Sequence, residues 1–184
     1  MGRPLRPVAD GVIYHALNRG NNRGPVFFSA EDYRTFLRAL ARTKERYPFD
    51  LFGYCLIGNH FHLVLRPHDG QSISRILQSL TVARTWHYHS RRRSCGHVWQ
   101  GRFKSPVVQD DDHLLTMLRY AESNPLRAGM VKDLADYPWS SYRVHGLGEA
   151  DELPAPPPIR LGMGKTEDAR RAFWPSPQGR EKMN

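Results

Sequence analysis

Cysteine is scarce in this chain, since Cys55 and Cys95 are the only two among 184 residues. Two cysteines exclude both a disulfide framework and a zinc site built from cysteine ligands. Cys55 lies inside an apolar segment, which indicates a buried free thiol. We therefore expect a fold that depends on its hydrophobic core.

Long apolar runs are missing as well. No segment approaches the ~20 residues that a membrane-spanning helix requires, and residues 1–7 are followed by no apolar core of the signal-peptide type. We expect a soluble cytoplasmic protein that does not engage a membrane.

Acidic residues are few relative to basic ones, with 18 Asp and Glu against 27 Lys and Arg and a formal net charge of +9. Such an excess favours polyanionic partners such as nucleic acids. The length suits one domain with a tail. Beyond Gly146 the composition becomes rich in proline and then in basic residues. We expect a domain over residues 1–146 and a Pro-rich basic tail over 147–184 that is either flexible or docked.

The order of expected elements indicates the fold class. Alternating or helical periodicity predicts strands over residues 12–18, 51–57, 60–66 and about 106–108, and helices over 30–46, from 73 onward and over 113–124. The order β-α-β-β-α-β followed by a helix is the ferredoxin-like α+β pattern. We expect an antiparallel sheet with helices packed on one face and the other face free for a site.

A His60-Phe61-His62 sequence follows the turn Gly58-Asn59, which links two expected strands. Side chains alternate along a strand, so the two imidazoles share one side. Two neutral imidazoles at this spacing can bind one divalent metal ion. The alternative is a pair of ordinary polar residues on a solvent-facing strand.

Basic and aromatic residues alternate between positions 84 and 104. They are Arg84, Trp86, Tyr88, Arg91, Arg92, Arg93, Trp99, Arg102, Phe103 and Lys104. Guanidinium groups contact phosphates and flat rings stack on unpaired bases, so the mixture suits single-stranded or looped nucleic acid. A solvated run of charge beside core aromatics is an equal alternative. Arg19 and Arg23, in a glycine-rich turn, could add charge at a phosphate.

Tyr120 and Asn124 are four residues apart near the end of the last expected helix, so they share one helical face if the helix persists. A tyrosine hydroxyl has a pKa of about 10 and needs help to act as a nucleophile, which a metal ion can supply at a phosphate. The alternative is a packed aromatic residue and an ordinary helix end.

Several ordered motifs resemble one family. They are YCLIGNHFHLVL over residues 54–65, VWQGRFKS over 98–105 and RYAESNPLRAGMV over 119–131, with residues 14–15, 19–23 and 137–142. Together they resemble the REP-associated tyrosine transposases, single-tyrosine transposases of the HUH nuclease superfamily. The likeness extends from about Arg3 to His145.

The resemblance implies a metal-dependent enzyme of the nucleoid that recognises a hairpin in single-stranded DNA, such as a REP-like palindrome, and cleaves beside it. It implies His60, His62 and Asn124 as ligands of Mg²⁺ or Mn²⁺, and Tyr120 as the nucleophile that becomes linked to a 5′ phosphate. The expected DNA contacts are Arg19, Asn21, Arg23, Arg84, Arg91, Arg92, Arg93, Trp99, Arg102 and Lys104. The protein would act as a monomer or a homodimer.

Two other functions remain open from the sequence. A histidine-triad nucleotide hydrolase would need a third histidine at position 64, where the chain has Val64. A noncatalytic RNA- or DNA-binding module would share the fold and the charge. It would not explain why His60, His62 and Tyr120 occur together.

Overall fold

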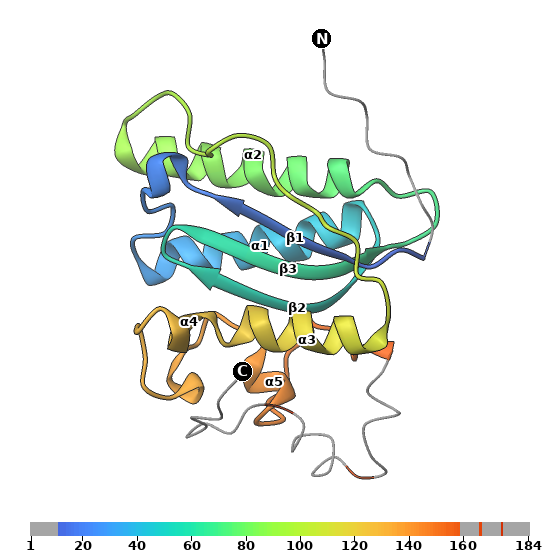
Figure 1. Ribbon diagram of the computed structural model, residues 1–184. Coiled ribbons are helices and arrows are strands. Elements are labelled where there is room, and N and C mark those ends of the chain that lie inside the picture. Colours follow the sequence, from blue (N-terminus) through green and yellow to red (C-terminus); the bar gives the residue numbers. More distant parts are fainter. Residues whose placement is uncertain (1–10, 159–165, 167–173, 175–184) are drawn as a thin grey trace.

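The computed structural model describes residues 11–158, residue 166 and residue 174 (Figure 1). The strands are β1 (Tyr14–Arg19), β2 (Phe49–Ile57) and β3 (His60–Pro67). The helices are α1 (Ala30–Arg46), α2 (Ile73–Arg92), α3 (Asp111–Glu122), α4 (Asn124–Arg127) and α5 (Tyr142–His145), with short 3-10 segments η1 (Asn21–Arg23) and η2 (Leu134–Asp136). None of these helices combines the length and the apolar character of a membrane span. The architecture is α+β, as the sequence predicts.

The sheet has the strand order β1-β3-β2, and both strand pairs are antiparallel. The turn at residues 58–59 joins β2 to β3, which confirms the predicted hairpin. Leu17 of β1 pairs with His62 of β3, and Arg19 pairs with His60. Because directly paired residues of an antiparallel sheet share a face, this register brings the end of β1 beside the two histidines.

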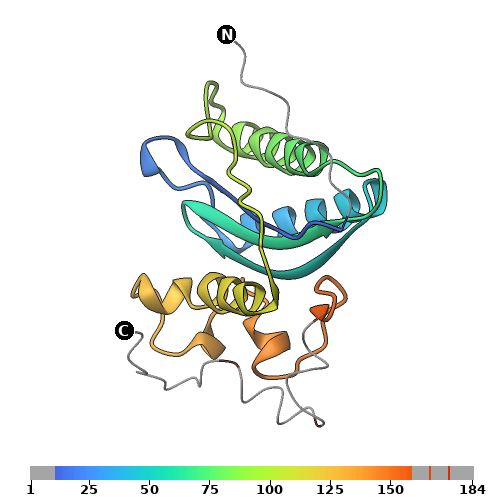
Figure 2. The same ribbon diagram turned by 45° about the vertical axis from the view of Figure 1, so that its right-hand side comes forward.

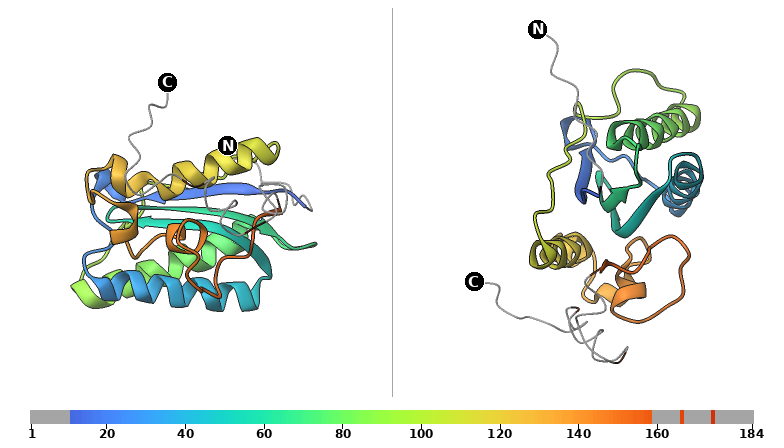
Figure 3. Two further views of the ribbon diagram at one scale, coloured as in Figure 1. Left: turned by 90° about the horizontal axis from the view of Figure 1, so that it is seen from below. Right: turned by 90° about the vertical axis from the view of Figure 1, so that its right-hand side faces the viewer.

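Helices α1 and α2 cover one face of the sheet, as expected (Figure 3). A capping box between Ser29 and Asp32 begins α1, and the Ser72 side chain caps α2 by accepting a hydrogen bond from a backbone N–H. Phe61 of β3 packs against Phe36 of α1, with ring centroids 5.2 Å apart. These contacts belong to the larger of the buried clusters.

Helix α3 lies on the opposite face, so the sheet is sandwiched between α2 and α3 in Figure 2. Leu114 and Leu118 of α3 pack with Val64 of β3 in a second buried cluster. Gly53 of β2 permits this close approach, because a Cβ at that position would lie 2.5 Å from a methyl carbon of Leu118. The expectation that helices pack on one face only and leave the other free is therefore wrong, because the face that carries the histidines is partly covered by α3, the helix that carries Tyr120.

The segment near residues 106–108, where a strand is expected, forms only isolated bridges with β1. Tyr14 bridges Val107 and Leu17 bridges Lys104, whereas no continuous ladder forms in the described part of the chain. Pro106 has no backbone N–H to donate, which weakens any regular ladder at this edge. The predicted fourth strand is thus an irregular edge that still follows β1.

Part of the expected tail packs on the domain. The Asp151 carboxylate accepts a hydrogen bond from Tyr54, and the Ala155 N–H donates to the Leu51 carbonyl. Trp174 is buried. The rest of the tail, residues 159–165, 167–173 and 175–184, and residues 1–10 lie outside the described residues.

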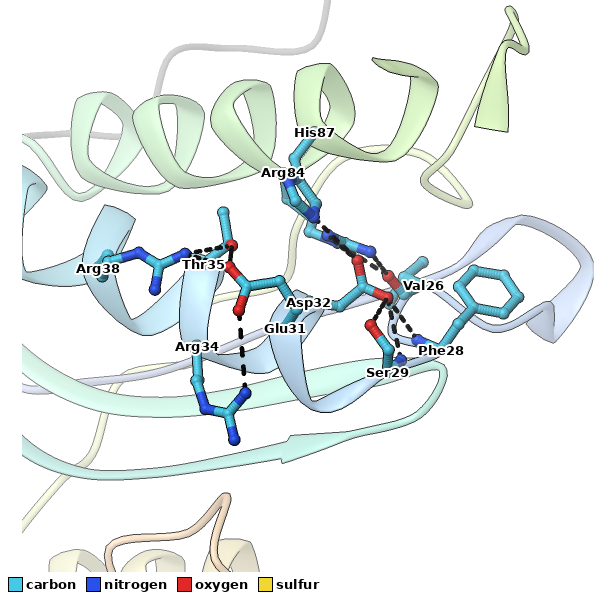
Figure 4. A network of polar contacts seen from close by, with 10 residues as sticks. All are labelled: Val26, Phe28, Ser29, Glu31, Asp32, Arg34, Thr35, Arg38, Arg84 and His87. Carbon is cyan, nitrogen blue, oxygen red and sulfur yellow. Dashed lines mark hydrogen bonds and ion pairs between the residues drawn. The ribbon is translucent and has the colours of Figure 1, made fainter. Parts of the chain in front are cut away.

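Asp32 and Arg84 form a buried ion pair between α1 and α2 (Figure 4). Arg84 Nη1 lies 2.9 Å from Asp32 Oδ1, and the guanidinium also donates to the Val26 carbonyl. Asp32 Oδ2 accepts the backbone N–H groups of Phe28 and Ser29. Burial by itself raises the pKa of Asp32, but these N–H donors and the Arg84 charge together hold that pKa below its usual value.

Replacing Asp32 with asparagine is expected to lower the free energy of unfolding at pH 7 by about 3 kcal/mol, because the buried Arg84 charge loses its counterion. The carboxylate stabilises the fold above the unfolded-state pKa of about 4, and this stabilisation disappears as the pH falls through the lower folded-state pKa. Urea denaturation should show the difference between D32N and wild type shrinking below about pH 4. The control E31Q alters an exposed carboxylate and should leave the midpoint nearly unchanged. An equal deficit at every pH would contradict the ionic explanation.

Candidate active site

Three histidines from two neighbouring strands meet on the α3 face of the sheet. His60 and His62 lie at the start of β3, and their ring centroids are 4.9 Å apart. His15 of β1 stacks on His62 at 5.1 Å, with its Nε2 atom 2.9 Å from His62 Nδ1. The expected histidine pair is therefore part of a cluster of three. Sequence reasoning missed His15 as a site residue, because only the pairing of β1 with β3 places it there.

Tyr120 reaches this cluster from α3. Its half-buried ring lies edge-on to His62 at a centroid distance of 5.8 Å and to His15 at 6.1 Å. The Arg127 guanidinium lies 4.9 Å from the centroid of the same ring, on its face. The structure thus brings the expected nucleophile beside His62, one of the expected metal ligands, and places a cation beside the phenol.

Burial keeps the three imidazoles in their neutral form near pH 7. It is the main cause that lowers the pKa of His62 to about 2, with smaller effects from His15 and His60. Burial, assisted by His113, lowers the pKa of His15 to about 4, and burial with Arg19 lowers that of His60 to about 4. Neutral imidazoles have a lone pair available for a metal ion.

A buried ring nitrogen in the cluster has no hydrogen-bond partner in the described part of the chain. His62 Nε2 is buried and finds neither donor nor acceptor among the described residues. A buried polar atom without a partner is costly, so such an atom in a native site calls for an explanation. A metal ion that accepts the Nε2 lone pair would provide one, and the residues present fit such an ion.

Asn124 stands where α3 gives way to α4. The sequence predicts one helix that reaches residue 124. In the structure α3 ends at Glu122, and the separate short helix α4 begins at Asn124. The Asn124 Nδ2 group donates to the Tyr120 carbonyl at 2.8 Å and to the Ala121 carbonyl at 3.2 Å. Among the described residues, no three His, Cys, Asp or Glu side chains are placed so that all three could bind one metal ion, and this includes the three clustered histidines. An ion held by His60 and His62 would need further ligands of other types, such as a carboxamide or water oxygen.

The end of α3 is anchored by a buried carboxylate. Glu122 is fully buried, and its Oε1 atom accepts hydrogen bonds from Ser141 at 2.5 Å and from His145 at 2.6 Å. Its other oxygen accepts the indole N–H of Trp174. These contacts fix the helix turn that presents Tyr120.

Most of the expected DNA contacts are exposed around the ends of β1 and α2. Eight of these residues are solvent-exposed: Arg19, Asn21, Arg23, Arg91, Arg92, Arg93, Arg102 and Lys104. The Asn21 N–H donates to the Val98 carbonyl, so the turn after β1 and the segment after α2 lie side by side. Both segments therefore expose basic residues in the same region.

Two of the expected contacts have other roles. Arg84 is 2% exposed and pairs with Asp32, so the expected DNA contact at Arg84 is wrong. The Trp99 indole donates to Thr81 and Thr85 of α2 and lies edge-on to Phe61, which indicates packing. Trp86, by contrast, is 76% exposed and is available for stacking. A helical pattern alone cannot separate these cases.

Two relatives are similar to this chain. One, in Haemophilus influenzae, is provisionally named a REP-associated tyrosine transposase and is 28% identical over 117 residues, which are 58% of this chain and 66% of that protein. The REP-associated tyrosine transposase of Escherichia coli K12 is 20% identical over 139 residues, which are 73% of this chain and 78% of that protein.

A solved structure and a family profile agree with these likenesses. The structure of a REP-associated tyrosine transposase bound to a REP hairpin matches with a TM-score of 0.66 at 20% identity, over 85% of this chain and 93% of that one, so the fold is the same. The profile of the IS200-like transposases matches residues 9–124, which include His15, His60, His62, Tyr120 and Asn124. The chain belongs to the IS200-like transposase family.

Proposed function

We propose that this transposase-family protein is a metal-dependent endonuclease and strand transferase that acts on single-stranded DNA beside a hairpin. The observation that carries the proposal is the position of Tyr120, whose ring lies 5.8 Å from that of His62 on a shared face. Nucleic-acid binding alone would not explain why a phenol lies against a buried cluster of neutral histidines. The tyrosine comes from α3, and His60 and His62 come from β3.

Tyr120 acts as the nucleophile. Its hydroxyl oxygen forms a bond to the phosphorus of a phosphodiester while the bond from that phosphorus to the 3′ oxygen breaks. The phenol gives up its proton and the leaving oxygen gains one, so the products are a 5′-phosphotyrosine and a free 3′ hydroxyl. The reaction conserves the number of phosphoester bonds, and the reverse attack by a 3′ hydroxyl can rejoin strands without a nucleotide cofactor.

The histidines and Asn124 form the proposed metal site. His60, His62 and the Asn124 carboxamide oxygen would hold Mg²⁺ or Mn²⁺, because hard cations accept amide oxygen and Mn²⁺ also tolerates imidazole. When bound, the ion neutralises charge on the scissile phosphate. The Arg127 guanidinium, 4.9 Å from the centre of the Tyr120 ring, places a positive charge beside the proposed nucleophile.

A DNA hairpin with a single-stranded flank is the proposed substrate. A relative of the same fold binds a REP hairpin. The exposed basic residues around the ends of β1 and α2 supply phosphate contacts, and the exposed indole of Trp86 can stack on an unpaired base. Perfect duplex offers no unpaired base and should bind less well.

A cleavage assay tests the function. The protein is incubated with a panel of labelled single-stranded hairpins with flanks, in Mg²⁺ or in chelator, and the products are separated under denaturing conditions. We expect metal-dependent cleavage with the 5′ end of one product attached to protein. Tight hairpin binding with no cleavage of any substrate would instead support the noncatalytic module.

Affinity for the flanked hairpin should fall steeply with salt, because each phosphate contact releases counterions. Changing Arg91, Arg92 and Arg93 together to alanine is expected to reduce the slope of log affinity against log salt by roughly 0.7 to 0.9 per lost phosphate contact. Fluorescence anisotropy at several salt concentrations measures this slope. The matched control removes three positive charges from α1, at Arg38, Arg42 and Arg46. Equal losses in both variants would mean that net charge, and not this surface, determines binding.

A further inference from the structure

The Nδ1 atoms of both proposed histidine ligands are occupied by neighbouring side chains. Asn59 Oδ1 lies 2.6 Å from His60 Nδ1, and His15 Nε2 lies 2.9 Å from His62 Nδ1. Asn59 and His15 belong to different elements, the β2–β3 turn and β1. Each proposed ligand therefore has one side-chain partner, and in both cases the partner lies at hydrogen-bond distance from Nδ1.

The orientation of the Asn59 amide determines which nitrogen of His60 is protonated. Asn59 Nδ2 lies 3.0 Å from the Arg23 carbonyl oxygen, which can only accept a hydrogen bond. The amide nitrogen must face that carbonyl, so Oδ1 faces His60. An amide oxygen also only accepts, so His60 Nδ1 carries the proton and His60 Nε2 keeps its lone pair.

The His15 contact does the same for His62 when His62 donates. Either ring of this pair can be the donor, because neutral imidazole has one N–H and one acceptor nitrogen. Donation from His62 Nδ1 leaves Nε2 as a lone pair, and His62 Nε2 is the buried atom with no partner among the described residues. The near-parallel stacking of the two rings, at 15°, also restricts rotation of His62.

We propose that Asn59 and His15 are positioning residues that hold His60 and His62 in the Nδ1-protonated tautomer and direct both Nε2 atoms toward the metal. This inference rests on the metal site of the proposed function. Partners that bond the second nitrogen of a ligating histidine fix its tautomer and orientation, and their loss commonly weakens metal binding by about 10- to 100-fold. The Asn59 and His15 side chains contact the proposed ligands themselves, so they act through the ligands.

Two pairs of variants separate positioning from a general structural role. N59A removes the acceptor for His60, whereas N59D keeps an oxygen there. H15F keeps ring volume but removes the acceptor for His62, whereas H15Q offers an amide oxygen. Mn²⁺ alone is the probe, and electron paramagnetic resonance of the free ion measures its affinity. We expect N59A and H15F to bind Mn²⁺ about 10- to 100-fold more weakly than wild type, and N59D and H15Q to recover most of the loss.

Histidine tautomers provide a readout without metal. Long-range ¹H–¹⁵N correlation spectra of the wild-type protein should show His60 protonated on Nδ1, and N59A should shift His60 toward the Nε2-protonated form. Thermal unfolding of each variant verifies that the fold is retained.

The inference is overturned if wild-type His60 is protonated on Nε2, or if N59A and H15F bind Mn²⁺ within about twofold of wild type. It also fails if N59D and H15Q lose as much affinity as N59A and H15F. A different result, equal Mn²⁺ affinity of wild type and the H60A/H62A double variant, would instead remove the metal site from the proposed function. The two failures are thus distinguishable.

Discussion

Replacing Tyr120 with phenylalanine is expected to eliminate the covalent protein–DNA adduct completely. The substitution removes only the hydroxyl oxygen, while the ring can keep its edge contacts with His15 and His62. Wild-type protein incubated with Mg²⁺ and a labelled flanked hairpin should give a band that survives denaturing electrophoresis, and Y120F should give none. Hairpin affinity and thermal stability of Y120F should match those of wild type.

The matched control is Y47F, because Tyr47 is a partly buried tyrosine just after α1, on the other side of the sheet. That variant should form the adduct at the wild-type rate. Mass spectrometry of the digested adduct should locate the nucleotide on the peptide that contains Tyr120. Cleavage by Y120F at the wild-type rate would show that water or another tyrosine is the nucleophile.

Replacing both His60 and His62 with alanine is expected to reduce cleavage by at least about a thousandfold, since loss of several kcal/mol of charge stabilisation at the phosphate corresponds to such a factor. Hairpin binding should persist, because phosphate contacts from exposed arginines supply most of its affinity. Single-turnover cleavage and anisotropy measure the two properties separately. Mn²⁺ affinity should fall in parallel with cleavage.

The control H68A changes a histidine just beyond the end of β3 that pairs at the surface with Asp50. It should retain both activities. His62 is buried, so H62Q is a second variant that guards against loss of folding, with thermal unfolding as the check. Full Mg²⁺-dependent cleavage by the double variant would contradict the metal site.

Local signals made much of the fold predictable from sequence. The turn at 58–59 has its predicted role, and the caps at Ser29 and Ser72 begin helices α1 and α2 where helical periodicity predicts them. Each of these signals acts within a few positions of the chain. Strand alternation likewise placed His60 and His62 on one face correctly, because that periodicity is a property of a single strand.

Contacts between segments that are distant in the sequence could not be predicted from local patterns. His15 lies 47 positions from His62, and nothing in either segment states that β1 pairs with β3 in this register. Arg84 occurs in a stretch of exposed arginines, yet it is buried because Asp32 of another helix neutralises it. The face chosen by α3 depends on the space above Gly53, which no periodicity reveals.

The separation of the site between two layers has a consequence for biosynthesis. All three histidines lie before the end of β3 at Pro67, whereas Tyr120 comes much later in the chain, in α3. Because synthesis proceeds from the N-terminus, the sheet that carries the histidines emerges from the ribosome before the tyrosine has been made. A nascent or truncated chain therefore has two of the proposed metal ligands, His60 and His62, without the proposed nucleophile. On the proposed mechanism, covalent attack on DNA requires that α3 has docked over Gly53, so an unfinished protein would not cut DNA through this tyrosine.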